Sequence, residues 1–361
     1  MKSLYPWCVI LCLIITLSAC GSGETSTDTP PPNAQDETPE MVALPTSPPS
    51  AQDEPPKALP GRILFAQEGT IWQVQQEQLQ ALLPSGDAWQ PRWSPDGSML
   101  VYVRRGQSFS DVYLADANGQ DLAQLTANGS SLPLQSFERI YDTLWAWYPT
   151  WSPDGNEIVV VSQYAPPVGS PAAEYNLALY TMSPDATNMN LLYLDEEGQI
   201  GSLAYHPDGL GLAFTRASLH VDEQQIYWLD LATGLSQLFP GVPPRSYDPA
   251  FSPDGAWMAF AARVDNTTDI WLLPGMVDEA AATASEPEPQ RLTTHGWARA
   301  PVFSPDGAYL AFLAIPPGKG GFELWVANVL TDQRGGIYLD TPRQMTRDLH
   351  IDPDSGLSWG L

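Results

Sequence analysis

The stretch Trp93-Ser94-Pro95-Asp96-Gly97 returns in related form four more times along this chain of 361 residues. The later copies begin at Trp151, Tyr205, Phe251 and Phe303, and each keeps the Pro-Asp-Gly core. The prolines of successive copies lie 46 to 58 residues apart. A repeat of this length indicates a propeller or a solenoid.

The Pro-Asp-Gly core is typical of a tight turn, because Pro presets its φ, Asp can bond back to the backbone and Gly tolerates a positive φ. An aromatic residue ends one strand before each turn, and an apolar run such as Met99 to Val103 follows it, so each repeat opens with a β-hairpin. An aliphatic residue followed by Trp or Tyr, as at Ile270-Trp271, marks a third strand. A short fourth strand, such as Arg291 to Thr293, completes a four-stranded blade.

The two ends of the repeat region each hold part of a blade. Residues 62–66 resemble the second strand of a blade that has no first strand before it. The missing strand is expected at residues 357–361, where Trp359 takes the place of the strand-ending aromatic. Five full repeats and one shared blade predict an all-β, six-bladed β-propeller of four-stranded antiparallel blades, closed by pairing of its N- and C-terminal strands.

These repeats resemble those of the TolB-type (PD40, WD40-like) β-propeller family, whose units carry the Trp-Ser-Pro-Asp-Gly hairpin. The resemblance covers residues 61–361 and departs from the pattern at Tyr205-His206. It implies the propeller fold. It implies no single function, because the family includes periplasmic binding propellers, lipoproteins and propellers fused to peptidases.

The first 20 residues are expected to be a signal peptide. Lys2 precedes a mostly apolar run that is too short to span a membrane comfortably. The following Leu17-Ser18-Ala19-Cys20 resembles the bacterial lipobox, which implies lipidation of Cys20. A plain secretory peptide is the alternative.

Residues 21–58 are rich in Pro, Thr, Ser and Glu and are expected to form a disordered tether, which leaves residues 59–361 as the propeller domain. We therefore expect a lipoprotein of the bacterial cell envelope, anchored to a membrane through Cys20. The domain would face outside the cytoplasmic membrane, in the periplasm or at the cell surface.

The formal net charge of −26 argues against nucleic acid as a partner, because phosphate binding requires a basic surface. We interpret the charge as a device that keeps an exported domain soluble, and we expect a monomer. Attraction of cations or of a basic partner is the alternative.

Candidate catalytic and metal-binding motifs are few. The stretch Gly356-Leu357-Ser358-Trp359-Gly360 matches the nucleophile elbow of α/β hydrolases, but that elbow needs a strand-to-helix turn and a later acid and His. The four histidines, at positions 206, 220, 295 and 350, fall at different points of their repeats, which argues against one metal cluster. We predict no catalytic residue, no metal and no cofactor.

A candidate ligand-binding site emerges from aromatic residues that the blade register leaves unexplained. They fall, with two arginines, in connections from the fourth strand of one blade to the first strand of the next. These residues are Trp89, Trp145, Trp147, Tyr148, Tyr247, Trp297, Arg245 and Arg299. Because such connections gather on one face of a propeller, we predict that a protein or peptide partner docks there, with a glycan as the alternative.

The sequence leaves two other interpretations open. The aromatics could merely plug the mouth of the channel. A hydrolase or lyase acting on a peptide or polysaccharide in the channel mouth is the rival function, and it requires a polar constellation such as His with paired carboxylates.

Overall fold

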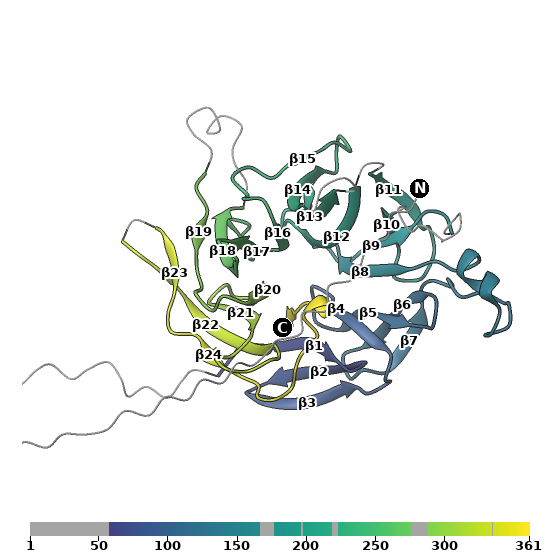
Figure 1. Ribbon diagram of the computed structural model, residues 1–361, viewed down its shortest axis with the longest axis horizontal. Helices are drawn as coiled ribbons and strands as arrows, with labels where there is room; N and C mark the ends of the chain where they lie inside the picture. The colour runs from purple at the N-terminus through teal and green to yellow at the C-terminus, as the bar shows by residue number, and fades with distance from the viewer. Residues whose placement is uncertain (1–57, 167–176, 196–197, 219–222, 276–286, 334) are drawn as a thin grey trace, which may run out of the picture. The chain divides into compact units, whose positions relative to one another are not determined.

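The computed structural model describes residues 58–166, 177–195, 198–218, 223–275, 287–333 and 335–361. These residues form a ring of six antiparallel sheets, as Figure 1 shows, so the predicted six-bladed β-propeller is confirmed. The expected signal peptide, Cys20 and the tether to residue 57 lie outside the described residues. In the part of the chain that the structure describes, no helix combines the length and apolar character that a membrane crossing needs.

The blades follow one another along the chain, and the strands of each run in sequence order from the innermost strand outward, with β25 as the innermost strand of blade 1. Blade 1 comprises β25 (Ser358–Gly360), β1 (Arg62–Gln67), β2 (Thr70–Gln75) and β3 (Gln78–Leu83). Blade 2 comprises β4 (Ala88–Trp93), β5 (Met99–Arg105), β6 (Ser110–Asp116) and β7 (Asp121–Gln124). Blade 3 comprises β8 (Ala146–Trp151), β9 (Ile158–Gln163), β10 (Leu177–Met182) and β11 (Asn190–Leu194).

The other three blades repeat this order. Blade 4 comprises β12 (Gly198–Tyr205), β13 (Gly211–Ser218), β14 (Gln224–Asp230) and β15 (Ser236–Leu238). Blade 5 comprises β16 (Ser246–Phe251), β17 (Trp257–Val264), β18 (Thr267–Pro274) and β19 (Gln290–Arg291). Blade 6 comprises β20 (Ala298–Phe303), β21 (Tyr309–Ala314), β22 (Glu323–Thr331), β23 (Ile337–Leu339) and β24 (Arg343–Gln344), and β22 pairs with both β23 and β24. Two short 3-10 helices complete the elements, η1 (Phe137–Tyr141) and η2 (Pro353–Ser355).

The ring closes as expected, through pairing of the two ends of the domain in blade 1. Strand β25 runs antiparallel to β1, with Arg62 opposite Gly360 and Leu64 opposite Ser358. The indole nitrogen of Trp359 donates a hydrogen bond to the carbonyl oxygen of Pro60 over 2.7 Å. Blade 1 therefore shares its strands between the start and the end of the domain, and no blade is left with an unpaired inner face.

The Pro-Asp-Gly turns join the first two strands of blades 2 to 6, and their bonds explain the repeated residues. In the first copy the hydroxyl of Ser94 donates to the carboxylate of Asp96 over 2.6 Å and accepts a bond from the backbone nitrogen of Met99 over 3.0 Å. Gly97 has a φ of +69°, a conformation that glycine adopts without steric cost. In blade 4, His206 replaces the serine and places its Nδ1 2.8 Å from the Asp208 carboxylate.

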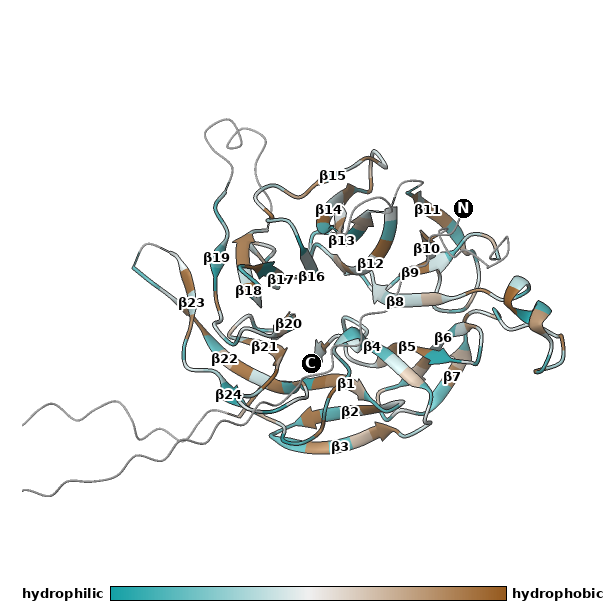
Figure 2. Cartoon of the chain, viewed as in Figure 1, coloured by the Kyte–Doolittle hydropathy of each residue, from teal (hydrophilic) through white to brown (hydrophobic). Residues whose placement is uncertain are grey.

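The hydrophobic core lies between neighbouring blades. One cluster joins Leu64 and Ile71 of blade 1 to Leu100 and Tyr102 of blade 2, and all four side chains are fully buried. Figure 2 shows the hydrophobic residues concentrated along the strands of the blades. Each blade is therefore stabilised by packing on both of its neighbours, which distributes the core around the ring.

The inner strand of each of blades 2 to 6 contains a β-bulge, at the same point in four of them and one residue earlier in β12 of blade 4. The register with the second strand shifts between Trp89 and Arg92 in blade 2, and between Tyr247 and Ala250 in blade 5. The residue three places before the strand-ending aromatic takes a positive φ in most blades, at Gln90, Tyr148, Asp248, Ala300 and, in blade 1, Gly356. A bulge adds one residue to the strand, so the side chains on its two sides no longer alternate in one register.

Candidate functional site

Five of the eight predicted site residues lie in strands, so for these five the prediction of loops is wrong, whereas the other three lie in the connections as expected. Five belong to the inner strands: Trp89 in β4, Trp147 and Tyr148 in β8, Tyr247 in β16, and Arg299 in β20. The other three, Trp145, Arg245 and Trp297, immediately precede β8, β16 and β20. The reason is the bulge, because each strand continues through it for several residues although the alternation of its side chains is broken.

Seven of these residues share a second repeat register. Four stand four places before the strand-ending aromatic, namely Trp89, Trp147, Tyr247 and Arg299, and three stand six places before it, namely Trp145, Arg245 and Trp297. Residues two apart on a strand point to the same side. Trp145 and Trp147 accordingly stack, with ring centroids 5.5 Å apart and an angle of 7° between the ring planes. We call the seven residues the rim.

The rim consists of two groups. Trp89 and the stacked pair Trp145 and Trp147 belong to blades 2 and 3, and Arg105 lies over the ring of Trp89 at 4.2 Å. Arg245, Tyr247, Trp297 and Arg299 belong to blades 5 and 6, with blade 4 between the two groups on one side of the ring. The eighth residue, Tyr148, lies at the bulge of β8 and lines the central cavity between the inner strands. The structure thus brings Trp145 against Trp147 and gathers the four residues of blades 5 and 6 around two neighbouring pockets, whereas Trp89 contacts Arg105.

Buried acids at the start of three of the third strands hold the connection that leads to the next blade. Asp269 accepts hydrogen bonds from the hydroxyl of Thr293 over 3.0 Å and from the backbone nitrogen of Gly296 over 3.1 Å. This fixes the chain directly before Trp297. Asp111 and Glu323 occupy the same place in blades 2 and 6 and accept equivalent bonds from Thr126 and Thr346. Sequence reasoning missed these acids, although each directly precedes an aliphatic–aromatic pair or its equivalent.

A pocket of about 620 Å³ lies beside Trp297 at the rim. Its walls include Arg245, Tyr247, Arg263 and Glu223, and Trp297 itself is 56% exposed. Neither Arg245 nor Arg263 forms an ion pair with a carboxylate of the described residues. Arg263, at the end of β17, was missed by sequence reasoning. It comes beside Arg245 because its backbone nitrogen donates to the Arg245 carbonyl over 3.0 Å.

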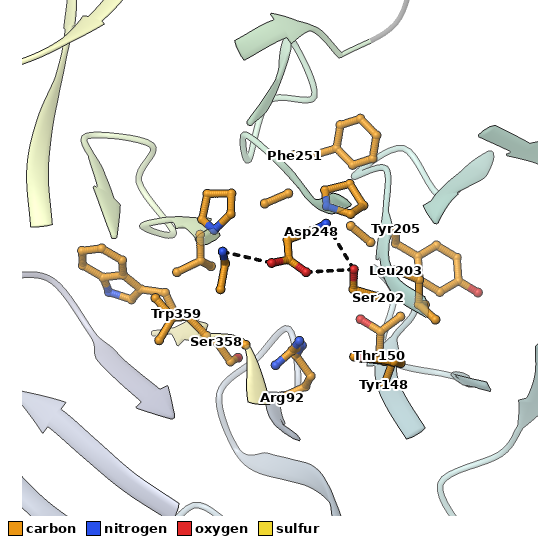
Figure 3. A pocket seen from close by; sticks show the side chains of 18 of the residues that line it. Arg92, Tyr148, Thr150, Ser202, Leu203, Tyr205, Asp248, Phe251, Ser358 and Trp359 are labelled. Atoms are coloured by element: carbon orange, nitrogen blue, oxygen red, sulfur yellow. Dashed lines mark hydrogen bonds between the residues drawn. The ribbon is translucent and has the colours of Figure 1, made fainter. Parts of the chain in front are cut away.

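A charged network crosses three blades below the rim. The guanidinium of Arg299 donates to Asp248 over 2.9 and 3.3 Å and to Asp354 of η2 over 2.7 Å. Figure 3 shows Asp248 also bonded to Ser202 of blade 4, over 3.1 Å. Burial acts to lower the pKa of Arg299, but the charge and hydrogen bonds of Asp248 outweigh it and raise that pKa above its usual value. This part of the predicted site is therefore a structural tie between blades as well as part of the rim.

The central cavity, about 370 Å³ in volume, lies between the inner strands. Its lining extends from Asp354 to Pro95, Pro153 and Pro207 of the Pro-Asp-Gly turns, so it reaches the face opposite the rim. Figure 3 shows Arg92 and Tyr148 among its walls. Burial lowers the pKa of Arg92 to about 10, and burial together with the charges of Asp248 and Asp354 raises the pKa of Tyr148 to about 12.

The histidines and the elbow-like motif form no catalytic arrangement among the described residues. His295 packs on the rings of Phe312 and Trp325, and its buried Nδ1 has no hydrogen-bond partner. Ser358 lies on β25, where its hydroxyl accepts a bond from the backbone nitrogen of Trp93 over 2.9 Å. No group of three or more His, Cys, Asp or Glu side chains suited to a metal occurs in the described part of the chain, and His220 lies outside it.

Comparison with known proteins places the fold among TolB-type propellers. The structure of TolB from Acinetobacter baumannii superposes with a TM-score of 0.57 at 18% identity, covering 84% of this chain and 68% of that one. A TolB-type protein from Agrobacterium tumefaciens gives a TM-score of 0.53 at 17% identity, covering 82% of this chain and 95% of that one. At these identities the likeness defines the class of fold, a six-bladed propeller of the TolB type.

In sequence, the chain is similar to the uncharacterized peptidase YuxL of Bacillus subtilis. The two are 29% identical over 183 residues, which is 50% of this chain. The matched part spans 22% of the peptidase, about a fifth of its length. No protein-family model matches the chain.

Proposed function

We propose that this protein is a binding propeller that docks a protein or peptide partner at its rim. The observation that carries the proposal is the pocket beside Trp297, where a largely exposed indole adjoins two arginines that have no carboxylate partner among the described residues. Exposed aromatics with arginines are the residues most enriched at interaction hot spots. In a chain of net charge −26, two adjacent arginines without counterions favour a partner that presents carboxylates at this place.

We also propose that the propeller is held at the bacterial cell envelope by lipid on Cys20, outside the cytoplasmic membrane. The support is the lipobox-like sequence at residues 17–20 and the acidic, Pro-rich segment after it. Cys20→Ala should move the protein from the membrane fraction to the soluble fraction, and retention in the membrane would contradict the proposal.

The rim proposal is tested by crosslinking on native membranes, followed by binding measurements on the partner that is captured. Trp297→Ala should weaken binding by about 30-fold, since truncation of an aromatic hot spot costs about 2 kcal/mol. Arg245→Ala and Arg263→Ala should each weaken it in a salt-dependent manner. If protease does not digest the captured molecule, the ligand of the rim is a glycan and not a protein or peptide.

The matched control is Phe137→Ala. Phe137 belongs to η1, which projects outward from the ring in Figure 1, and its side chain is 70% exposed. This variant should bind as the unaltered protein does. If Trp297→Ala binds equally well, or loses binding only together with its thermal stability, the rim is not the docking site.

A hydrolase or lyase is the alternative function. Its support is the sequence likeness to a peptidase, which covers one half of this chain. It predicts turnover of peptide or polysaccharide substrates that is abolished by changes in the channel. Turnover that survives in the Trp297→Ala variant but not in an Asp248→Asn variant would support this alternative over docking at the rim.

A further inference from the structure

One position of the inner strands places a side chain on the central cavity in every blade. It is the residue directly before the strand-ending aromatic: Arg92, Thr150, Ala204, Ala250, Val302 and Ser358. Five of the six are small, and Arg92 alone among these six carries a charge. The small residues leave the space into which the guanidinium of Arg92 points, as Figure 3 shows. The cavity volume of about 370 Å³ lies in the range of small-ligand sites.

The hydrogen-bonding capacity of Arg92 is only partly used by the protein. Its Nη1 donates to the carbonyl of Pro91 over 2.8 Å and approaches the carbonyl of Ser355 at 3.4 Å. Its Nε and Nη2 have no partner among the described residues, and it forms no ion pair with a carboxylate there. Arg92 is half-buried and lines the cavity, so these unused donors can bond an acceptor that enters it.

The two acids that line the cavity, Asp248 and Asp354, are both paired with Arg299. Both oxygens of Asp248 accept bonds from Arg299, and further bonds come from Ser202 and from the backbone nitrogen of Ala300. The charge of Asp248 acts on Arg92, but the two side chains do not form an ion pair. The arginine that faces the open space is therefore Arg92, whereas Arg299 is taken up by Asp248 and Asp354.

Hydroxyl-bearing side chains line the same cavity, among them Ser202 and Ser358, which have hydrogen-bond partners, and Tyr205. Tyr148 and Thr150 both line it, and neither hydroxyl has a hydrogen-bond partner among the described residues. The phenol of Tyr148 is protonated at neutral pH, as an ordinary tyrosine is, so it can donate a hydrogen bond. The cavity thus presents a planar guanidinium edge and the hydroxyls of Tyr148 and Thr150 to a ligand that enters it.

We propose that the central cavity is a binding site for a carboxylate, which pairs with the outer edge of Arg92 and accepts hydrogen bonds from Tyr148 and Thr150. A carboxylate matches the planar, two-pronged geometry of a guanidinium better than a single acceptor does. The carboxylate belongs either to the C-terminal end of an extended peptide or to a small free acid. The site opens toward the Pro-Asp-Gly turns, so it is separate from the rim and does not rest on the function proposed for the rim.

The test compares acids with their amides at constant ionic strength. The probes are N-acetyl-triglycine and propionate, each paired with its carboxamide, and the readout is the dose-dependent rise in melting temperature of the purified protein. We expect both acids to stabilise the protein and both amides to leave it unchanged. Tenfold tighter binding of the peptide acid than of propionate identifies a chain end as the ligand, and equal binding identifies a free acid.

Three variants complete the test. Arg92→Gln should abolish the response to acids, and Tyr148→Phe, which keeps the aromatic ring, should weaken binding several-fold. The second variant decides the matter if the first does not fold. Arg343→Gln is the matched control, because Arg343 is an exposed arginine paired with Glu77 over 2.5 Å and remote from the cavity. Equal binding of acids and amides, or an undiminished response in both cavity variants, would overturn the proposal.

Discussion

At the scale of single residues, the carboxylate of each Pro-Asp-Gly turn organises the bonds around it. Asp96 accepts hydrogen bonds from the hydroxyl of Ser94 over 2.6 Å and from the backbone nitrogen of Ser98 over 3.1 Å. These bonds favour the charged form and lower the pKa of Asp96 to about 2. Asp154 and Asp254 accept the corresponding bonds, and their pKa values are also lowered, first by the serine hydroxyl two residues before. The turns are therefore built around ionised aspartates.

This arrangement predicts a pH-dependent effect of Asp96→Asn. The pKa of Asp96 is lower in the folded protein than its ordinary value of 3.8, so its contribution to stability is fully present above about pH 4. That contribution is lost as the pH falls toward 2. The variant should melt below the unaltered protein at pH 6, and the two melting temperatures, followed by circular dichroism, should converge near pH 2.

An exposed acid outside the turns provides the control for this prediction. Glu288→Gln removes a carboxylate at a position that the structure leaves exposed, and its effect should not follow the pH dependence of Asp96. A difference between Asp96→Asn and the unaltered protein that persists unchanged at pH 2 would mean that Asp96 acts through its shape and not through its charge.

At the scale of the strands, the sequence predicted the elements better than their lengths. The hairpins, the third strands and the closing strand followed from turn residues and apolar runs, which depend on local sequence. The inner strands continue several residues further toward the rim than expected, because the bulge at Gln90 or Asp248 interrupts the alternation that marks a strand. The pairing of β22 with both β23 and β24 was not foreseen either.

The candidate site was predictable only in part, for the same reason. The repeated spacing of Trp147, Tyr247 and Arg299 before the strand-ending aromatic could have been found by counting back from each turn. The approach of Arg263 to Arg245, and the position of Arg92 on the central cavity, depend on the pairing of strands and on the curvature of the ring. Neither is encoded in local sequence.

The closing strand β25 carries the next prediction. Trp359 is 8% exposed, packs against Tyr309 with ring centroids 6.2 Å apart, and donates a hydrogen bond to Pro60. Trp359→Ala should lower the free energy of unfolding by about 3–5 kcal/mol, the usual cost of removing a buried Trp side chain. Trp359→Phe should cost less, since it keeps an aromatic ring and loses the hydrogen bond.

Urea unfolding measures both losses. Deletion of Leu361, whose side chain is 66% exposed, is the control and should change stability little. If Trp359→Ala costs no more than that deletion, the pairing of β25 with β1 does not hold the ring closed.

At the scale of the whole molecule, closure of the ring stabilises the fold and the net negative charge destabilises it. The blades form a ring in which each packs on two neighbours, so the chain buries a core distributed between all six. The same chain carries 42 acidic residues against 16 basic ones. Like charges repel across a compact domain and are further apart in the unfolded chain, so the excess of acid destabilises the fold while keeping the protein soluble.

We therefore expect added salt to stabilise the protein. Raising sodium chloride from about 10 mM to about 0.2 M shortens the screening length from roughly 30 Å to less than about 10 Å, which weakens repulsion across the domain more than it weakens close, half-buried pairs such as Arg299 with Asp248. The melting temperature should rise steeply over this range and then level off. A rise that begins only above about 0.5 M and increases steadily would reflect general exclusion of salt from the protein surface instead. A melting temperature that is constant or falls between about 10 mM and about 0.2 M would show that the ion pairs between blades, and not the net charge, dominate the electrostatic free energy of this propeller.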